Sequence, residues 1–373
     1  MFLATASLAV VLQWSSFPPV ANAESYDVYV DKQADPEGDG SEEKPYTSIA
    51  DAIKRALAND EDERSIGVKK GVYNETLVVG ESVEIDGAGR GRTVISGKVQ
   101  MEDGSELKNL TIDTSANTGI SIEDGEADVS LSDVEIRGTR KIGIDIAPGK
   151  GKLTFEKLVI HKGKGKGIYV QRGHEIEITD SKIYDNVEEG IDIRDDVTGK
   201  IRNNTVYENG ESGIELILGD SVLNIRGNNI FKNKASGIST QFYATAQSLG
   251  EVNIQENKIS NNGKYGLHCG IPSGGNPIAS YWAKSVNLVK NVIEKNALEE
   301  INPFCKIIEA VDPYEEEDNS IKETVPDQGA LVPPVEVTPS AVKITEEDLT
   351  KERTIWDQVE SLARNDEEGE KKA

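Results

Sequence analysis

Aliphatic residues return at nearly constant intervals through the middle of this chain, each followed by the same polar pattern. The chain reads DSKIYDNVEEGIDI at residues 180–193, NNTVYENGESGIEL at 203–216 and GNNIFKNKASGIST at 227–240. In each of these units an Asn follows an aliphatic anchor by three positions and a Gly follows it by seven. The anchors of eight such units are Ile112, Ile136, Ile160, Ile183, Val206, Ile230, Ile259 and Ile293. Their spacing of 23 or 24 residues, lengthened to 29 and 34 at the end, predicts a solenoid.

Short alternating segments within each unit indicate strands rather than helices. TVYEN, IFKNK and GIDIRDD alternate apolar with polar residues, are rich in β-branched residues, and are separated by Gly and Asn. Residues 107–302 show no sustained helical spacing. The sequence therefore predicts an all-β parallel β-helix in which each coil adds roughly 4.8 Å of rise.

Asn recurs in two columns of this alignment. Three positions after the anchor stand Asn186, Asn209, Asn233, Asn262 and Asn296, and two positions before it stand Asn204, Asn228, Asn257 and Asn291. Asn tolerates the left-handed backbone of a corner, and stacked amides bond to the coils above and below. We therefore expect structural ladders rather than catalysis. The recurrent Gly is expected at a corner that requires positive φ or close approach of another coil.

One residue of each GIxI segment lies between two inward aliphatic residues and so points outward. This column contains Ser121, Asp145, Tyr169, Asp192, Glu215, Ser239, His268 and Asn302, and two residues further along lie Gln171, Arg194 and Gln241 among others. Asp192 and Glu215 are thus expected on adjacent coils, and a close carboxylate pair raises one pKa, which suits acid–base work. The candidate catalytic residues are Asp192, Glu215, His268 and Arg194. The alternative is ordinary polarity on a solvent-facing side.

The two long intervals place insertions after Thr240 and after Cys269. They carry Tyr243, Tyr281 and Trp282 beyond the outward column, where aromatic rings can stack on sugars. The alternative is that these rings close the end of the core. The candidate substrate-binding residues are Asp145, Tyr169, Gln171, Gln241, Tyr243, Tyr281, Trp282, Arg140 and Lys164.

Charge is uneven along the chain. The net charge of −25 argues against nucleic acid as a partner, because phosphate binding requires a basic face. Between Arg137 and Arg172, however, ten basic residues stand against two acidic ones, and Arg140 and Lys164 share one position in adjacent coils. Such a patch either binds the carboxylates of a uronate polymer or balances the acidic remainder.

The two ends of the chain differ from the repeats. Residues 1–23 have the apolar run and the Ala21-Asn22-Ala23 ending of a signal peptide, which predicts a secreted, cell-envelope or periplasmic protein. No other segment is long and apolar enough to span a membrane. We expect the β-helix domain at 24–312, an acidic Pro-rich linker at 313–344 and an amphipathic helix within 345–373. That helix either docks on the open end of the solenoid or recruits a protein partner.

No cofactor is predicted. Two acidic patterns give weak support for Ca²⁺: DPEGDG at 35–40, where Tyr46 replaces the Glu expected at the twelfth position, and the pair Asp195-Asp196. The two cysteines, Cys269 and Cys305, fall two residues out of register on adjacent coils. A disulfide between them therefore requires the last coil to deviate from the regular repeat.

These units resemble the right-handed parallel β-helix repeats of the pectate-lyase-like superfamily. YVDKQADPEGDGSEEKPYTSIADAIKRA resembles the family's opening strand, loop and N-terminal capping helix, and SIGVKKGVYNETLVVGESVEIDGAGRGRTVISG resembles its first coils, as in pectin methylesterases. The resemblance covers about residues 26–305 and implies a single-stranded right-handed β-helix. It does not imply one activity, because the superfamily includes lyases, hydrolases, esterases, epimerases and non-catalytic carbohydrate-binding members. The methylesterase Asp motif, a GHG motif and a GIDPH-like run have no match here.

Three hypotheses follow, in this order. The first is an exported β-helix protein that binds or displays polysaccharide at the cell envelope. The second is a polysaccharide lyase or C5-epimerase that acts on an acidic glycan through Asp192, Glu215 and His268, with Arg194 or the Arg140/Lys164 patch. The third is an assembly protein that recruits a partner through its C-terminal helix.

Overall fold

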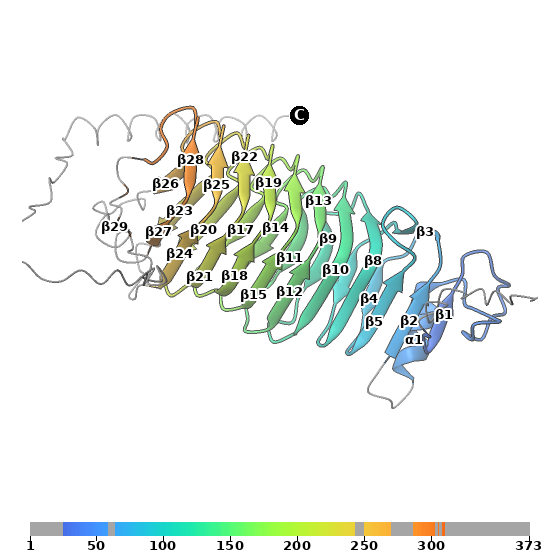
Figure 1. Cartoon of the computed structure of the whole chain (residues 1–373). Helices are drawn as coiled ribbons and strands as arrows, with labels where there is room; N and C mark the ends of the chain where they lie inside the picture. Colours follow the sequence, from blue (N-terminus) through green and yellow to red (C-terminus); the bar gives the residue numbers. More distant parts are fainter. Residues whose placement is uncertain are drawn as a thin grey trace, which may run out of the picture.

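The predicted repeats form a parallel β-solenoid. The structure, a computed structural model, describes residues 25–58, 64–242, 250–269, 286–302, 305 and 308–309. Figure 1 shows the strands stacked coil on coil along one axis, in sequence order. The all-β parallel β-helix expected from the repeats is confirmed over the described residues.

One side of every regular coil belongs to a sheet of nine strands. These strands are β4 (Leu77–Val79), β7 (Val99–Met101), β9 (Thr118–Ile122), β11 (Ile142–Ile146), β14 (Ile168–Val170), β17 (Ile191–Ile193), β20 (Ile214–Leu218), β23 (Ile238–Phe242) and β26 (Leu267–Cys269). From β9 to β26 they contain the GIxI-like segments of the repeat, so this sheet presents the outward column.

The other side of the coils forms a second sheet, whose strands lie in two rows. The first row is β1 (Val28–Val30), β2 (Arg64–Val68), β5 (Val83–Gly87), β8 (Ser105–Asp113), β10 (Val129–Arg137), β12 (Lys152–Glu156), β15 (Glu175–Thr179), β18 (Thr198–Arg202), β21 (Val222–Arg226), β24 (Glu251–Gln255), β27 (Val286–Val289) and β29 (Ile308–Glu309). The second row is β3 (Gly71–Tyr73), β6 (Thr93–Ile95), β13 (Val159–His161), β16 (Lys182–Tyr184), β19 (Thr205–Tyr207), β22 (Asn229–Phe231), β25 (Lys258–Ser260) and β28 (Val292–Glu294). The long strands β8 and β10 belong to both rows.

The register is the one that the anchors predict. Each anchor lies opposite the next in the second row, from Ile112 through to Ile293. Most inward positions are aliphatic and fully buried, and Phe155 is one of the few large rings inside. Each Ile or Leu buried in this way stabilises the fold by roughly 1.5–3 kcal/mol.

Both Asn ladders are present and buried. The Asn209 side chain receives hydrogen bonds from the Asn186 side chain (3.1 Å) and backbone (3.2 Å), and it donates to the Asn233 side chain (3.0 Å) and to the Ile183 carbonyl (3.2 Å). The second column, from Asn204 to Asn291, repeats this pattern. The structural role expected for these residues agrees with this geometry.

The expected backbone of the ladder residues is wrong. Asn209 is not left-handed; the residue before it is, with φ 55° at Glu208, and Asp185 and Lys232 behave likewise in their coils. A left-handed residue costs roughly 1–2 kcal/mol outside Gly, and here it turns the chain so that the next side chain enters the corner. The ladder Asn therefore acts through its buried amide rather than through its backbone.

The recurrent Gly is required by close approach and not by positive φ. A Cβ on Gly190 would lie 2.6 Å from a Val206 methyl and 2.7 Å from the Gly213 carbonyl oxygen of the next coil. In the eighth unit Glu300 replaces this Gly, and its carboxylate accepts a hydrogen bond from Asn296 (2.8 Å). Glu300 therefore completes the ladder at its last member.

One helix precedes the regular coils. α1 (Ile49–Leu57) buries Ile49, Ala52, Ile53 and Ala56 on one face. Ser48 caps its N-terminus, and the Ser48 side chain accepts a hydrogen bond from the Asp51 amide. The Glu75 carboxylate also accepts from the first amides of the helix. Helix α1 contacts β1 and β2, and its role as the cap of the solenoid stays a prediction. Among the described residues, no helix is long and apolar enough to cross a membrane.

The two cysteines form a disulfide. The Cα atoms of Cys269 and Cys305 lie 5.5 Å apart, although Ile301 pairs with Leu267 and regular strands would place Cys305 opposite residue 271. The Cys305 amide donates to the Asn302 carbonyl (2.9 Å), so the chain turns there and shortens the path. The last coil deviates as the bridge requires.

Several sequence-based expectations fall outside the described residues. They are the signal peptide at 1–23, the linker at 313–344, the helix within 345–373, and the aromatic residues Tyr243, Tyr281 and Trp282. The boundaries of the β-helix domain at 24 and 312 stay predictions for the same reason.

The position of an Asn within the ladder predicts how much stability is lost when its side-chain amide is removed. Asn209→Ala deletes four side-chain hydrogen bonds and leaves buried donors without acceptors, so we expect a loss of about 2–4 kcal/mol in the free energy of unfolding. Asn296→Ala, at the half-exposed end of the same column, is expected to cost about 1 kcal/mol. Urea denaturation followed by circular dichroism compares the two. Equal losses would contradict a ladder whose strength depends on burial.

Candidate functional site

The outward column is assembled as the repeat predicts. Across the nine-strand sheet, Asp145 lies opposite Tyr169, Tyr169 opposite Asp192, and Asp192 opposite Glu215. The column continues from Glu215 to Ser239 and His268. Four predicted candidates, Tyr169, Asp192, Arg194 and Glu215, are thereby brought together on β14, β17 and β20 and the residues that follow β17.

Asp192 is the centre of this group. Its Oδ2 atom lies 2.9 Å from Lys166 Nζ and 2.7 Å from an Arg194 guanidinium nitrogen. We expected this column to face solvent, but Asp192 is 0% exposed because Lys166 and Arg194 cover it. Burial raises the pKa of Asp192 in spite of these two cations. Its second oxygen, Oδ1, is buried and has no hydrogen-bond partner among the described residues.

Lys166 connects Asp192 to the preceding corner of the coil. Its Nζ lies 2.5 Å from Glu189 Oε2 and 3.6 Å from Glu188 Oε2. Burial alone would lower the pKa of Lys166, but Asp192 and Glu189 raise it above its usual value. Lys166 is therefore a permanent cation and not a general base.

Two further carboxyls have strongly raised pKa values. Burial, together with the nearby charges of Glu189 and Asp192, raises the pKa of Glu215 to about 7. Glu211 is exposed, yet desolvation at its contact with Glu189 and the hydrogen bond that the two residues share raise its pKa to about 8. The pKa of Glu189, in contrast, is lowered by that bond and by Lys166, against its burial. A proton is therefore held between Glu189 and Glu211 at neutral pH. Together, Lys166, Glu188, Glu189, Asp192, Arg194, Glu211 and Glu215 form what we term the charge cluster.

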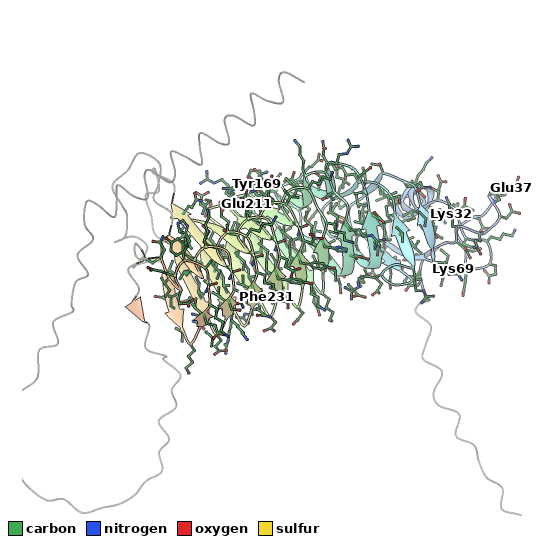
Figure 2. The ribbon with its side chains drawn as sticks, turned by 90° about the horizontal axis from the view of Figure 1, so that it is seen from above. Lys32, Glu37, Lys69, Tyr169, Glu211 and Phe231 are labelled. Atoms are coloured by element: carbon green, nitrogen blue, oxygen red, sulfur yellow. A yellow bond between two sulfur atoms is a disulfide. The ribbon has the colours of Figure 1, made fainter. Side chains whose placement is uncertain are left out.

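Tyr169 adds an aromatic ring beside the charge cluster. The Arg194 guanidinium carbon lies 5.2 Å and Lys166 Nζ 5.8 Å from the ring centroid, so two cations contact one ring. Gln241 donates to Glu215 Oε1 at 3.4 Å from the next coil. Figure 2 shows Tyr169 and Glu211 on one side of the solenoid and Phe231 on the other. The site is therefore confined to one face.

His268 lies apart from this group. It is separated from Glu215 by Ser239, which places it two strand spacings away, roughly 10 Å. Its Nδ1 is 3.3 Å from Ser239 Oγ, and its ring stacks on Tyr265. Burial, with a contribution from Lys264, lowers the pKa of His268 to about 4. The histidine is neutral at pH 7 and belongs to a different part of the face.

The remaining substrate-binding candidates lie around the cluster. Asp145 and Gln171 are half-buried on earlier coils, and burial raises the pKa of Asp145. Arg140 and Lys164 are exposed, and their backbone amides donate to the carbonyls of Ala116 and Thr139. Of the ten basic residues between 137 and 172, five form ion pairs with described carboxylates: Arg137, Lys152, Lys157, Lys166 and Arg172. Half of the basic patch thus balances neighbouring acids.

An aromatic stack on the opposite face was missed by the sequence analysis. Tyr184 stacks between His161 (4.9 Å between ring centroids) and Tyr207 (4.8 Å), and Tyr207 stacks on Phe231 (5.0 Å). All four residues directly follow an anchor, which is the signal that identifies them. Because their ring faces cover one another, they present edges to solvent and offer little surface for stacking on a sugar.

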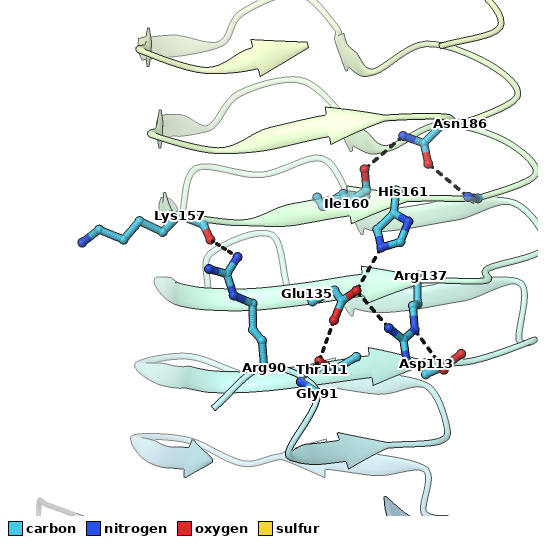
Figure 3. Close-up of polar contacts among 11 residues, drawn as sticks. Arg90, Gly91, Thr111, Asp113, Glu135, Arg137, Lys157, Ile160, His161 and Asn186 are labelled. Carbon is cyan, nitrogen blue, oxygen red and sulfur yellow. Dashed lines mark hydrogen bonds and ion pairs between the residues drawn. The ribbon is translucent and has the colours of Figure 1, made fainter. Parts of the chain in front are cut away.

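A polar network adjoins this stack. Glu135 accepts from Thr111 (2.9 Å) and Arg137 (3.0 Å) and contacts His161 Nε2 (2.9 Å), while Arg137 also pairs with Asp113 (Figure 3). Hydrogen bonds from His161 and Thr111, together with Arg137, lower the pKa of Glu135 against its burial. Although the buried His161 Nδ1 has no partner among the described residues, the other groups are engaged with one another, so we assign the network to stability.

Lys166, Glu188, Glu189 and Glu211 were also missed. Lys166 and Glu189 each directly precede the recurrent Gly, while Glu188 and Glu211 stand two positions before it. Register alone places Glu189 above Lys166 and Glu211 above Glu188. The 23-residue period, applied to the corner as well as to the GIxI segments, identifies all four residues.

The acidic segments considered for Ca²⁺ use their carboxylates within the protein. The Asp35 and Asp39 side chains accept hydrogen bonds from the Glu37 and Ser41 amides, and Asp195 pairs with Arg172 at 3.0 Å. Over the part of the chain that the structure describes, no three His, Cys, Asp or Glu side chains are grouped in a way that could hold a metal ion.

Comparison with known proteins supports the fold. Residues 97–248 match the family described as "Right handed beta helix region", and no curated protein is significantly similar in sequence. The pectate lyase Pel9A is 15% identical with a TM-score of 0.52, over 74% of this chain and 78% of that one. The A-module of the Azotobacter vinelandii mannuronan C-5 epimerase AlgE4 is 18% identical with a TM-score of 0.47, over 76% of this chain and 100% of that one. At such identities the likeness shows the fold alone, and the expected right-handed β-helix is confirmed.

The proton shared by Glu189 and Glu211 predicts a pH dependence of stability. Because the pKa of Glu211 is higher in the folded protein than the ordinary value of 4.5, its stabilising contribution is full below pH 4.5 and is lost as the pH rises through about 8. Glu211→Gln carries a neutral amide at every pH, so it should lose less stability than the wild type between pH 5 and 9. Urea midpoints across this range measure the difference. The exposed Glu126→Gln serves as control, and a pH profile of Glu211→Gln that matches the wild type would contradict the shared proton.

Proposed function

We propose that this protein, a right-handed parallel β-helix of the pectate-lyase-like superfamily, binds polysaccharide on the face formed by β14, β17 and β20. The observation that carries the proposal is a run of partly exposed groups on this face: Tyr169, Glu215 and Gln241 lie around the buried Asp192 on neighbouring coils. An aromatic ring beside carboxyl and amide groups suits the apolar face and the hydroxyls of a sugar.

The solenoid itself favours a long ligand. Successive coils repeat at roughly 4.8 Å and present the same column position each time, so a periodic polymer can make equivalent contacts along the axis. The fold is also that of the pectate lyase Pel9A, whose name refers to a polysaccharide substrate. That likeness concerns the fold, and the contacts of the charge cluster are the main support.

We further propose that the protein acts outside the cytoplasm, in the cell envelope, the periplasm or the medium. Two observations support this location: the signal-like residues 1–23 and the Cys269–Cys305 disulfide. Disulfides persist in oxidising compartments and are rare in the cytosol.

Binding should depend on Tyr169. Tyr169→Ala removes the ring from the face formed by β14, β17 and β20. We expect binding of the polysaccharide to weaken by about 3- to 10-fold, the usual contribution of an aromatic contact. Affinity electrophoresis of the full chain in gels that contain neutral or acidic polysaccharides measures the change. Tyr207→Ala, in the aromatic stack on the opposite face, is the matched control and should bind as the wild type does. An equal effect of both variants would contradict this choice of face.

A catalytic alternative, a lyase or C5-epimerase, is favoured by one observation. The pKa of Glu215, raised to about 7, suits a general acid or base at neutral pH. Lys166 is held as a cation and His268 is neutral and distant, so Glu215 would have to act without either as a base.

We expect binding without turnover. The assay incubates the full chain with uronate polymers and records unsaturated product by ultraviolet absorbance and C5 inversion by NMR. Turnover that Glu215→Gln lowers by about 100-fold or more, the usual effect of losing a general acid or base, would establish the catalytic alternative instead.

A further inference from the structure

The cations on the face formed by β14, β17 and β20 are already paired with carboxylates of the protein. Lys166 contacts Glu188, Glu189 and Asp192, and Arg194 contacts Asp192 while it lies over Tyr169. In the segments that follow β14 and β17, Arg172 pairs with Asp195 at 3.0 Å. A carboxylate of a ligand would therefore have to compete with these internal pairs.

Carboxyls outnumber cations in the charge cluster. It contains five carboxyls, on Glu188, Glu189, Asp192, Glu211 and Glu215, against the two cations Lys166 and Arg194. With protons on Glu211 and on part of the Glu215 population, the cluster is still net negative at pH 7. Like charges held at close range disfavour an anionic partner, most of all where water is excluded.

From these contacts we infer that the polysaccharide is uncharged where it crosses β14, β17 and β20: a neutral glycan rather than a uronate polymer. This inference rests on the proposed function and narrows it. It also disfavours the lyase and epimerase alternative, because both reactions act at a carbon next to a uronate carboxylate, and the cations that would neutralise that carboxylate are engaged.

The exposed cations on earlier coils are the competing location for an anionic ligand. Arg140, Lys141 and Lys164 are exposed, and none of them forms an ion pair with a described carboxylate. They lie in the corner that precedes β11 and β14, outside the charge cluster. A uronate polymer that binds the protein would do so through these residues.

Competition between neutral and anionic polymers tests the inference. The purified full chain is run at pH 7 through gels that contain a soluble neutral glucan, galactan or xylan, or else polygalacturonate or polymannuronate. We expect at least one neutral polymer to retard the protein and the uronate polymers to bind about 10-fold more weakly or not at all. Glu215→Gln removes a negative charge from the cluster and should raise affinity for the uronate polymers by about 3-fold or more. Glu126→Gln, an exposed glutamate on an earlier coil, should leave that affinity unchanged.

The outcomes separate the proposed polysaccharide binding from the neutral-glycan inference. Stronger binding of uronate polymers that Tyr169→Ala weakens would overturn the neutral-glycan inference and leave the proposed binding face intact. Stronger uronate binding that Tyr169→Ala leaves unchanged and that is lost in Arg140→Ala/Lys164→Ala would overturn the proposed face. Retardation by none of the five polymers would overturn the proposed function and the inference with it. Neutral binding that Tyr169→Ala weakens, combined with the Glu215→Gln gain toward uronates, is the result that supports both.

Discussion

The buried amide ladder is the interaction on which the rest of this structure depends. Each ladder Asn bonds to the coil before it and to the coil after it, so no coil can slip without leaving several buried polar groups unpaired. Strand pairing alone would tolerate a shift of two residues, since the apolar face would still point inward. The amides remove this freedom, and the units between Ile160 and Ile259 remain aligned even though their lengths differ.

Fixed register also explains the charge cluster. Stacking forces Glu215 above Asp192 and Glu211 above Glu188, and neither pair can separate without breaking the ladder beside it. The protein accommodates these like charges in two ways. It places Lys166 and Arg194 against the most buried carboxylate, and it retains protons on Glu211 and Glu215. The raised pKa values are thus a consequence of how the coils are built.

Much of the fold could be predicted because the sequence repeats with the period of one coil. The anchors, both Asn columns and the outward neighbours of Asp192 follow from counting along the repeat. Burial could not be predicted in this way: Asp192 occupies an outward position yet is covered by the long side chains of Lys166 and Arg194, whose conformations the repeat does not specify. The left-handed residues were misplaced by one position, since periodicity locates a corner but does not identify which residue makes the turn. The turn that brings Cys305 to Cys269 lies where the repeat ends, so no period describes it.

The position of the charge cluster along the solenoid bears on its use. In a solenoid each coil is stabilised by its neighbours, so terminal coils open more readily than central ones. Asp192 and Glu215 lie in coils whose corners carry Asn186 and Asn209, both buried and bonded to further coils. Asp192 and Glu215 therefore stand on coils that the amide ladder fixes. Because a rigid site loses little conformational entropy when it binds, a long and flexible polymer would bear most of the ordering cost itself. A shallow polar face can hold such a ligand only if several coils contribute contacts together, which is the arrangement that the uninterrupted column from Asp145 to His268 provides.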